Sequence, residues 1–430
     1  MSLQLGVIAD DLTGGMETAA MLVAEGVDCA FVTKPEGVAS VGDAQAVVVA
    51  QKTRVIDPAE AVRLSEEAAK NLQTAGARQL FFKYCGTFDS TDDGNIGPVA
   101  DRLLEMTGAD QTAFCPTSVE MERSVFNGHL FVGRQLVSES PKRHDPLTPM
   151  HDPNLVAVLG RQSAYPVGLV WHSAIHSGSS RLQKAVDDLV GSGIRHIVVD
   201  AIHEEDLAAI AELTESWKLM TGNAAIVRHY PAVWRARNRI GGRAEAKVVP
   251  AASGAGVVLA GSCAERTLAQ LDAFETHRPV NRIRLSDVEN PEQAIADALA
   301  WAERRLVDGP VAISTSASPD AVVAAQQRFG KDGAAALAER ILGEISVGLH
   351  RIGVRRFVVA GGETSGAVVE SLGVKSLHIG PYREAGIARA ATTSDDVTAL
   401  SLKSGKLGPV DMFLPMLDSM LRPEHTEDRP

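Results

Sequence analysis

The stretch LGVIADDLTGG, residues 5–15, gives the clearest indication of the fold. Its first half, from Leu5 to Ala9, is a short apolar run, and its second half is a polar turn that leads into a helical pattern from about Met16. Apolar runs of this length, bounded by turn residues, are typical of buried parallel strands. The stretch therefore predicts the first strand, turn and helix of an α/β fold.

The same alternation recurs along the chain. We expect further strands at residues 30–32, 46–49, 79–82, 112–114, 167–170 and 196–199, and then at 257–260, 281–285, 311–314 and 356–360. Amphipathic stretches such as 58–73 and 206–216 lie between them, which is the pattern of parallel strands connected by helices. Asn127-Gly128, between two apolar runs, interrupts it and predicts a β-hairpin.

The length of 430 residues exceeds what one hydrophobic core usually supports. A segment rich in small residues, 249–256, is expected to be a linker or loop between two series of strands. We therefore predict an α/β protein of two domains, residues 1–245 and 246–430. Each is expected to hold a mostly parallel sheet flanked by helices, with a ligand cleft between the domains.

The charge of the chain bears on its partners. It carries 54 acidic and 42 basic residues, a formal net charge of −12. This is poorly suited to sequence-independent nucleic-acid binding, which depends on neutralising phosphates. No apolar run approaches the roughly 18 residues of a membrane span, and no secretory signal pattern is found at the N-terminus. We expect a cytoplasmic protein with small-molecule ligands and no nucleic-acid or membrane partner; a homodimer is left open.

Asp10 and Asp11 directly follow the first predicted strand. In open α/β sheets, ligands bind beyond the carboxyl ends of the strands, where these side chains are expected. Paired carboxylates could hold a sugar hydroxyl, accept its proton or orient metal-bound water. The alternative is structural: one aspartate caps the helix that follows, and Gly14 and Gly15 make the turn.

A second polar segment, KYCGTFDST at residues 83–91, again follows a strand and precedes a helix. One cation and several hydrogen-bonding groups lie close together in it, as a polyhydroxy acid requires. The alternative is a helix N-cap at Asp89 or Ser90 after an ordinary loop. The candidate contact residues are Lys83, Thr87, Phe88, Asp89 and Ser90.

Arg54 follows the strand-like run at 46–50. Because a guanidinium is a planar fork of donors, this arginine is a candidate for binding a carboxylate with two hydrogen bonds. The alternative is a solvated surface arginine.

The histidines of the polar middle region show no metal-site spacing, and the four cysteines are scattered. We therefore expect surface or hydrogen-bonded histidines rather than a metal site. The histidines concerned are His144, His151, His172 and His176.

Three small-residue turns in the second half follow strands or small polar runs: AGSC at 260–263, AGGETSG at 360–366 and SLKSG at 401–405. Glycine-rich turns that lead into helices expose backbone N–H groups where the helix favours negative charge, so they suit phosphates. No GxxxxGK[ST] motif occurs, and no GxGxxG follows the first strand. The three turns together predict a phosphate-binding domain.

Together these motifs resemble the four-carbon acid sugar kinase family, formerly a domain of unknown function. The resemblance runs nearly the whole length and rests on residues 8–14, 88–91 with 94–97, 261–263, 360–366 and 402–405. It implies an ATP- and Mg²⁺-dependent kinase that phosphorylates the terminal hydroxyl of threonate, erythronate or 3-oxo-tetronate. Residues 83–91 and 128–132 are most similar to the 3-oxo-tetronate 4-kinase branch.

The resemblance also implies a role for each domain: residues 1–245 would bind the acid sugar and residues 246–430 the nucleotide. By position it assigns sugar-acid contacts to Asp10, Arg54 and Thr87–Ser90, to which the local chemistry adds Asp11 and Lys83. Either Asp89 or Asp10 would accept the hydroxyl proton, and either Arg54 or Lys83 would pair with the carboxylate; no residue is assigned to the metal. The residues implied to contact ATP are Ser262, Gly361, Gly362, Glu363, Thr364 and Gly405.

Three segments depart from the pattern expected of the family: Gly86, Met121–Arg123 and Gly222–Ala225. They keep a second hypothesis open, that of a non-catalytic or substrate-diverged member that binds a small carboxylate and a nucleotide. A third class, another α/β enzyme such as a dehydrogenase, is disfavoured because the dinucleotide fingerprint is missing.

Overall fold

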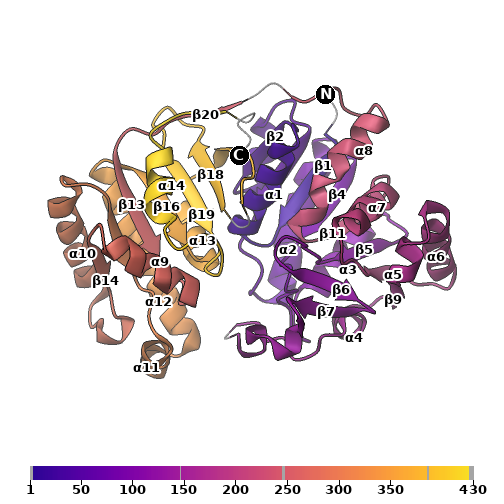
Figure 1. Cartoon of the computed structure of the whole chain (residues 1–430), viewed down its shortest axis with the longest axis horizontal. Helices are drawn as coiled ribbons and strands as arrows, with labels where there is room; N and C mark the ends of the chain where they lie inside the picture. The colour runs from indigo at the N-terminus through magenta and orange to yellow at the C-terminus, as the bar shows by residue number, and fades with distance from the viewer. Residues whose placement is uncertain (1–2, 146, 245–246, 385–386, 426–430) are drawn as a thin grey trace. The chain divides into compact units, whose positions relative to one another are not determined.

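The chain divides into two compact units, Met1–Glu245 and Ala246–Pro430. The structure is a computed structural model that describes residues 3–145, 147–244, 247–384 and 387–425. In Figure 1 the colours run from indigo to pink over the first unit and from red to yellow over the second. Each unit contains mostly parallel strands flanked by helices, which confirms the predicted α/β fold. The cleft between the domains stays a prediction.

The first unit is built on a sheet in which every neighbouring pair of described strands is parallel. The central strands are buried along their whole length, so both faces of the sheet are covered, and this explains their uninterrupted apolar sequences. In spatial order the strands are β2 (Cys29–Val32), β3 (Ala46–Ala50), β1 (Leu5–Ala9), β4 (Gln79–Lys83), β11 (Leu219–Gly222), β5 (Thr112–Cys115), β10 (His196–Val199) and β9 (Val167–Val170).

Helices connect these strands and pack in two groups. α2 packs against α3 and α3 against α4, whereas α1 packs against the short 3₁₀ helix η4, which also contacts α7 and α8. The helices are α1 (Leu12–Ala24), α2 (Pro58–Thr74), α3 (Ile96–Thr107), α4 (Leu155–Gln162), α5 (His172–Ile175), α6 (Ser179–Gly191), α7 (Glu204–Thr214) and α8 (Tyr230–Ala236), with η4 at Ala224–Arg228.

The predicted hairpin at Asn127-Gly128 is confirmed. It joins β6 (Arg123–Phe126) to β7 (His129–Val132), and β8 (Gln135–Leu136) adds a third antiparallel strand. Both turn residues have positive φ, 52° and 73°, as a two-residue hairpin turn requires.

The first helix begins earlier than predicted, at Leu12 rather than near Met16. The Asp11 side chain accepts a hydrogen bond from the Gly14 N–H at 3.2 Å and so caps the helix. Gly14 and Gly15 are therefore helical and do not form the turn. A Cβ on Gly15 would lie 2.8 Å from the Ala50 Cβ, so this glycine allows α1 to pack closely against β3.

The second unit holds a sheet that is parallel through β19 and antiparallel beyond it. In spatial order its strands are β14 (Val280–Arg282), β15 (Val311–Ser314), β13 (Ala255–Ala260), β16 (Val354–Ala360), β19 (Ala399–Lys403), β18 (Ile387–Thr392) and β17 (Ser376–Ile379), with β12 (Val248–Val249) and β20 (Glu424–His425) as a separate pair. Its helices are α9 (Glu265–Glu275), α10 (Pro291–Leu306), α11 (Pro319–Phe329), α12 (Lys331–Arg351), α13 (Gly362–Ser371) and α14 (Phe413–Ser419).

Two local predictions in the second half were wrong in extent. The strand expected at 281–285 ends at Arg282, and a 3₁₀ turn at Leu285–Asp287 follows it. The expected linker, 249–256, includes the end of β12 and the start of β13. In both places the pairing of neighbouring strands, rather than local composition, sets the boundary.

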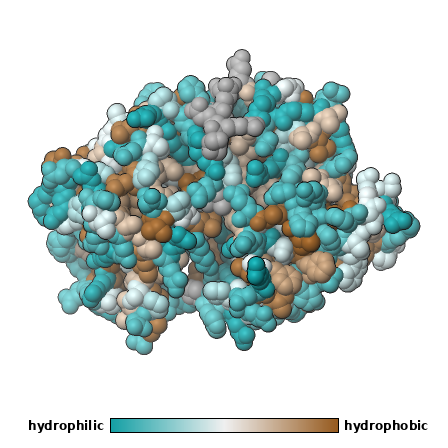
Figure 2. Space-filling view, viewed as in Figure 1, coloured by the Kyte–Doolittle hydropathy of each residue, from teal (hydrophilic) through white to brown (hydrophobic). Residues whose placement is uncertain are grey.

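The face of the molecule shown in Figure 2 is mostly hydrophilic, with hydrophobic residues scattered over it. Among the described residues, large exposed apolar side chains such as Trp171 and Val307 belong to different elements. No helix in the described ranges is both long and apolar enough to cross a bilayer.

Candidate active site

The first unit gathers polar side chains at the carboxyl ends of β1 and β4. These strands are parallel neighbours, with Ala9 opposite Lys83, so Asp10, Asp11 and the 83–91 segment emerge at the same edge. The strands that follow β1 in the chain, β2 and β3, lie on its other side, and this makes the β1–β4 junction a topological switch point. Ligands of open α/β sheets bind at such points.

Arg54 is held by both aspartates that follow β1. Its Nε donates to Asp10 Oδ2 at 2.8 Å, and its Nη2 donates to Asp10 Oδ1 at 2.7 Å and to Asp11 Oδ1 at 2.6 Å. Lys83 Nζ donates to the same Asp11 oxygen at 3.1 Å. The fork is thus occupied by protein carboxylates, while Nη1 of Arg54 makes no hydrogen bond to a described residue. Nη1 is the guanidinium nitrogen that a ligand could reach.

The two neighbouring carboxyl groups differ in acidity. Burial raises the pKa of Asp10 above its ordinary value, and the attraction of Arg54 and Lys83 offsets this only in part. Burial acts in the same direction on Asp11, but there Arg54 and Lys83 outweigh it and hold the pKa well below its ordinary value. Asp10 is therefore the better proton acceptor of the pair.

The 83–91 segment adopts an unusual backbone. Phe88 and Asp89 have positive φ, 63° and 28°, which non-glycine residues rarely adopt. The fully buried Phe88 ring packs edge-on against Tyr84, with ring centroids 5.4 Å apart, and anchors the turn. The packing of the Phe88 ring holds Asp89 near Arg54 and the two aspartates that bind it.

Asp89 is bound on one side only. Its Oδ1 accepts hydrogen bonds from Thr87 Oγ1 at 2.5 Å and from Lys142 Nζ at 2.8 Å. Its Oδ2 has no partner among the described residues. Burial favours a raised pKa for Asp89, but Lys142 and Arg54 outweigh it and keep the pKa well below its ordinary value. Asp89 is therefore an ionised carboxylate with one oxygen free to accept from a hydroxyl.

Sequence reasoning missed Lys142. This buried lysine lies in the 3₁₀ helix at Pro141–His144 and bridges Asp89 and Asp145, at 2.8 and 2.9 Å. Its segment has no strand or glycine-rich turn that would point to the site, and it reaches Asp89 across 53 positions of sequence. Only a long-range contact places it there.

Ser90 has a structural contact. Its hydroxyl pairs with the side-chain amide of Gln162 at the end of α4, so it ties the segment to that helix. The alternative of an N-cap at Asp89 or Ser90 is wrong, because α3 begins at Ile96 with Asn95 before it. The Asn95 amide donates to the Thr53 carbonyl at 2.7 Å, which steadies the chain next to Arg54.

The three departures from the family pattern lie side by side. A Cβ on Gly86 would lie 3.2 Å from Asn223 Nδ2, 3.2 Å from the Pro116 carbonyl oxygen and 3.6 Å from Arg123 Cγ. Gly86, Asn223 and Pro116 follow β4, β11 and β5, which are neighbouring strands, and Arg123 is the first residue of β6. The departures therefore form one spot on the same edge as Lys83.

In the second unit, the three predicted turns meet at the carboxyl ends of β13, β16 and β19. A Cβ on Gly405 would lie 1.8 Å from Ser262 Oγ, and a Cβ on Gly361 would lie 3.2 Å from the Ser262 nitrogen. Gly361 has φ 126°, and helix α13 begins directly after it. The first N–H groups of α13, from Gly362 to Thr364, point out of the helix N-terminus, as an anion site requires.

Two hydroxyl groups at the same edge were not predicted. Thr315 and Ser316 follow β15, the neighbour of β13, and both are buried. Their side-chain oxygens have no hydrogen-bond partner among the described residues. Buried hydroxyls without partners fit a site whose ligand supplies them.

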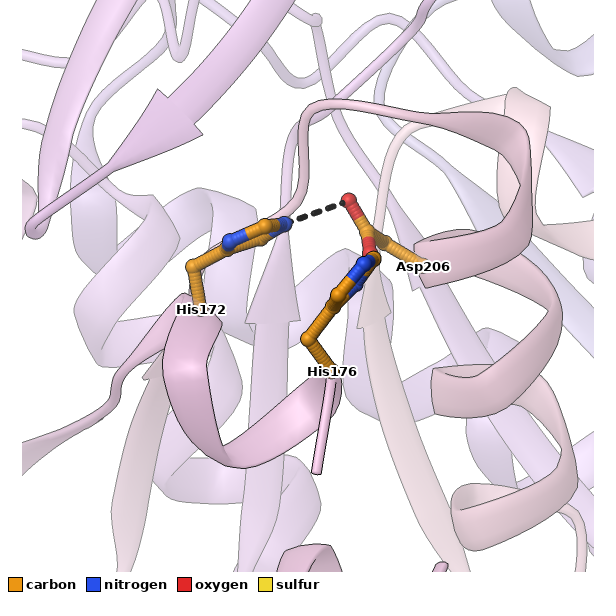
Figure 3. Close-up of side chains that lie close together, drawn as sticks. All are labelled: His172, His176 and Asp206. Atoms are coloured by element: carbon orange, nitrogen blue, oxygen red, sulfur yellow. Dashed lines mark hydrogen bonds and ion pairs between the residues drawn. The ribbon is translucent and has the colours of Figure 1, made fainter. Parts of the chain in front are cut away.

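Two of the histidines expected to be unremarkable lie with an aspartate. Figure 3 shows His172 and His176, at α5, turned toward Asp206 of α7. Asp206 Oδ2 accepts from His172 Nε2 at 3.2 Å and from the N–H groups of Ile202 and His203 at 2.9 Å, while Oδ1 lies 3.9 Å from His176 Nδ1. These are metal-ligand types, but helix capping and one His–Asp hydrogen bond account for the arrangement.

Comparisons with known proteins match each half of the chain to a different family. Residues 5–230 match a family described as a sugar-binding N-terminal domain, and residues 257–413 match a nucleotide-binding C-terminal domain. A Burkholderia multivorans protein named 3-oxo-tetronate kinase is 44% identical, covering 95% of each chain. A Pseudomonas fluorescens protein of the same name is 42% identical, again covering 95% of each.

Two solved structures are similar over nearly the whole length. A Salmonella typhimurium protein described as a putative tRNA synthase has a TM-score of 0.82 at 33% identity, covering 96% of this chain and 98% of its own. A Haemophilus influenzae protein of the DUF1537 family has a TM-score of 0.72 at 33% identity, covering 97% and 100%.

The fold and the two matched families, one described as sugar-binding and the other as nucleotide-binding, define a two-domain α/β kinase. The chain belongs to the four-carbon acid sugar kinase family, and it is a sugar-acid kinase. This excludes the dehydrogenase hypothesis.

Proposed function

We propose that the protein transfers the γ-phosphoryl group of ATP to the terminal hydroxyl of 3-oxo-tetronate, with threonate and erythronate as the alternative acceptors. The observation that carries the proposal is full-length similarity, at 35–44% identity, to proteins named 3-oxo-tetronate kinase. The two candidate sites support the proposal chemically. The site in the first unit offers carboxylates and cations, and the site in the second unit offers backbone N–H donors and hydroxyls.

On the first unit, Asp89 Oδ2 accepts a hydrogen bond from the substrate hydroxyl and Arg54 Nη1 donates to the carboxylate. Lys142 and Thr87 hold Asp89 from its other side. Phosphoryl transfer depends mostly on positioning and charge stabilisation, so a carboxylate with a low pKa is adequate to orient the hydroxyl. Asp10, whose pKa is raised, is the alternative proton acceptor.

On the second unit, the phosphates of ATP lie against Ser262, Gly405 and the start of α13 at Gly361–Thr364. The close approach of Gly405 and Gly361 to Ser262 supports this cradle, as do the partnerless hydroxyls of the neighbouring turn. Mg²⁺ bound to the phosphates would neutralise part of their charge.

The test is an assay of ADP release with ATP, Mg²⁺ and each of the three acids in turn. The proposal expects the highest kcat/KM with 3-oxo-tetronate. A higher value with threonate or erythronate changes the substrate but keeps the reaction.

A second candidate is a diverged family member that binds an acid and a nucleotide without turnover. The observation that favours it is the cluster of departures at Gly86, Arg123 and Asn223 beside Lys83. Calorimetric binding of both ligands with no ADP release would select this candidate.

A further inference from the structure

Lys403 is a buried amine at the carboxyl end of β19. It is fully buried, and its Nζ donates long hydrogen bonds to Thr267 Oγ1 at 3.3 Å and to the Gly405 carbonyl oxygen at 3.4 Å. It forms no ion pair within the described ranges. A buried ammonium normally has an anionic partner, because removing an unpaired charge from water is unfavourable.

The surroundings of this amine disfavour its charge. In register beside it, β16 places Ala360 and β18 places Ile387, both apolar. Helix α9 carries Arg266, a second cation, whose charge also disfavours the ammonium form of Lys403. Burial, helped by Arg266, lowers the pKa of Lys403 to about 7.

The position of this amine suggests what supplies the missing anion. Lys403 lies two residues before Gly405, which packs against Ser262 so closely that a Cβ would lie 1.8 Å from Ser262 Oγ. The amine therefore contacts, at 3.4 Å, the carbonyl oxygen of a residue that belongs to the proposed phosphate cradle. Since an anion within about 4–6 Å favours the charged form of an amine, a phosphate there would restore the charge.

We propose that Lys403 is the buried cation for a nucleotide phosphate bound at the contact between Ser262 and Gly405, and that it takes up a proton from solvent when the nucleotide binds. The inference rests on the proposed function, because that function supplies the phosphate. It predicts that nucleotide affinity falls as the pH rises above 7, by up to about tenfold per pH unit, since the neutral amine must be protonated first.

The experiment is calorimetry of ADP with Mg²⁺ binding to the full chain at pH 8, in two buffers of different ionisation enthalpy. At this pH the phosphates of ADP are already ionised. An amine with a pKa of about 7 is then about 90% neutral, so binding should take up about 0.9 proton. Lys403→Met should abolish the uptake and weaken ADP binding at least about tenfold. The control Lys331→Met, at an exposed lysine of α12, should change neither.

The outcomes separate the two proposals. If ADP fails to bind the wild-type chain, the nucleotide part of the proposed function is wrong. If ADP binds without proton uptake, the inference about Lys403 is overturned and the proposed function stands. In that case a weakened Lys403→Met variant means that the lysine only holds the turn through Thr267. Should this variant not fold, the wild-type proton count decides alone.

Discussion

Asp89 combines a strained backbone with a carboxylate that is held on one side only. Thr87 and Lys142 bind its Oδ1, and the thiol of Cys85 lies 3.0 Å from Thr87 Oγ1. Burial raises the pKa of this thiol, so it stays protonated and donates to Thr87, whose hydroxyl is then directed to Asp89. Because these donors hold Oδ1, the Oδ2 atom of Asp89 is left to accept a hydrogen bond from a ligand.

Asp89→Asn should lower kcat about 10²- to 10⁴-fold with little change in ADP affinity, because the amide keeps the shape but accepts the hydroxyl less well. Steady-state kinetics and ADP calorimetry measure this. Asp93→Asn, an exposed aspartate of the same loop, is the control and should be near wild type. If Asp89→Asn turns over normally while Asp10→Asn is inactive, the two roles are exchanged.

Arg54→Ala should have two effects. It leaves Lys83 as the one cation paired with Asp10 and Asp11 among the described residues, and unpairing buried charges typically lowers the free energy of unfolding by about 3–5 kcal/mol. It should also weaken binding of a four-carbon acid about ten- to a hundredfold, and binding of the uncharged polyol much less. Denaturant unfolding and calorimetry check the two effects separately. Equal weakening of acid and polyol would move the carboxylate contact to another cation.

At the scale of the element, the strand-to-helix turn at Gly361 sets a sharp steric test. A side chain is strained at φ 126°, and its Cβ would lie 3.0 Å from Thr364 Oγ1. Gly361→Val should therefore abolish ADP binding, while calorimetry of the acid is largely unchanged. Gly333→Val, on an exposed turn of α12 with ordinary space around it, is the matched control and should bind ADP normally. Normal ADP affinity in Gly361→Val would remove this turn from the nucleotide site.

Lys403 gives strand β19 a pH-dependent stability. Between pH 7 and about 10 the unfolded chain binds more protons at this residue than the folded chain, because the folded pKa is lowered to about 7. The buried ammonium of Lys403 destabilises the folded state fully below pH 7, and this destabilisation decreases as the pH rises. Without nucleotide, wild type should therefore gain stability over Lys403→Met from pH 7 to 9, by at most about 1.4 kcal/mol per pH unit. Urea unfolding at each pH measures this difference, and a constant difference would contradict it.

For the molecule as a whole, the candidate acid site belongs to the first unit and the candidate nucleotide site to the second. One reaction therefore requires that both ligands are bound. The proposed mechanism transfers the phosphoryl group directly between them. Initial-rate plots should therefore intersect, as for a ternary complex, and ATP–ADP exchange should be absent without the acid. Parallel plots with exchange would instead indicate a phosphorylated enzyme.

Much of the fold could be predicted from the sequence because burial leaves a local record. β1, β3 and β4 are buried on both faces and therefore read as continuous apolar runs. The turns after them are polar because the carboxyl ends of strands face ligands and solvent. Parallel pairing of β1 with β4 then brings Asp10 and Lys83 to one edge, so the meeting of these two candidate residues could be predicted from pattern alone.

The α/β class, most strands and the turns that carry the candidate residues could thus be predicted from local sequence patterns. The folded structure is what brings particular side chains together: Arg54 with Asp10, Lys142 with Asp89, and Lys403 with the Gly405 carbonyl oxygen. It also decided that Gly15 packs a helix against a strand. The physical reason is that strand and turn patterns depend on neighbours in sequence, whereas ion pairs and buried charges depend on packing between segments far apart in the chain.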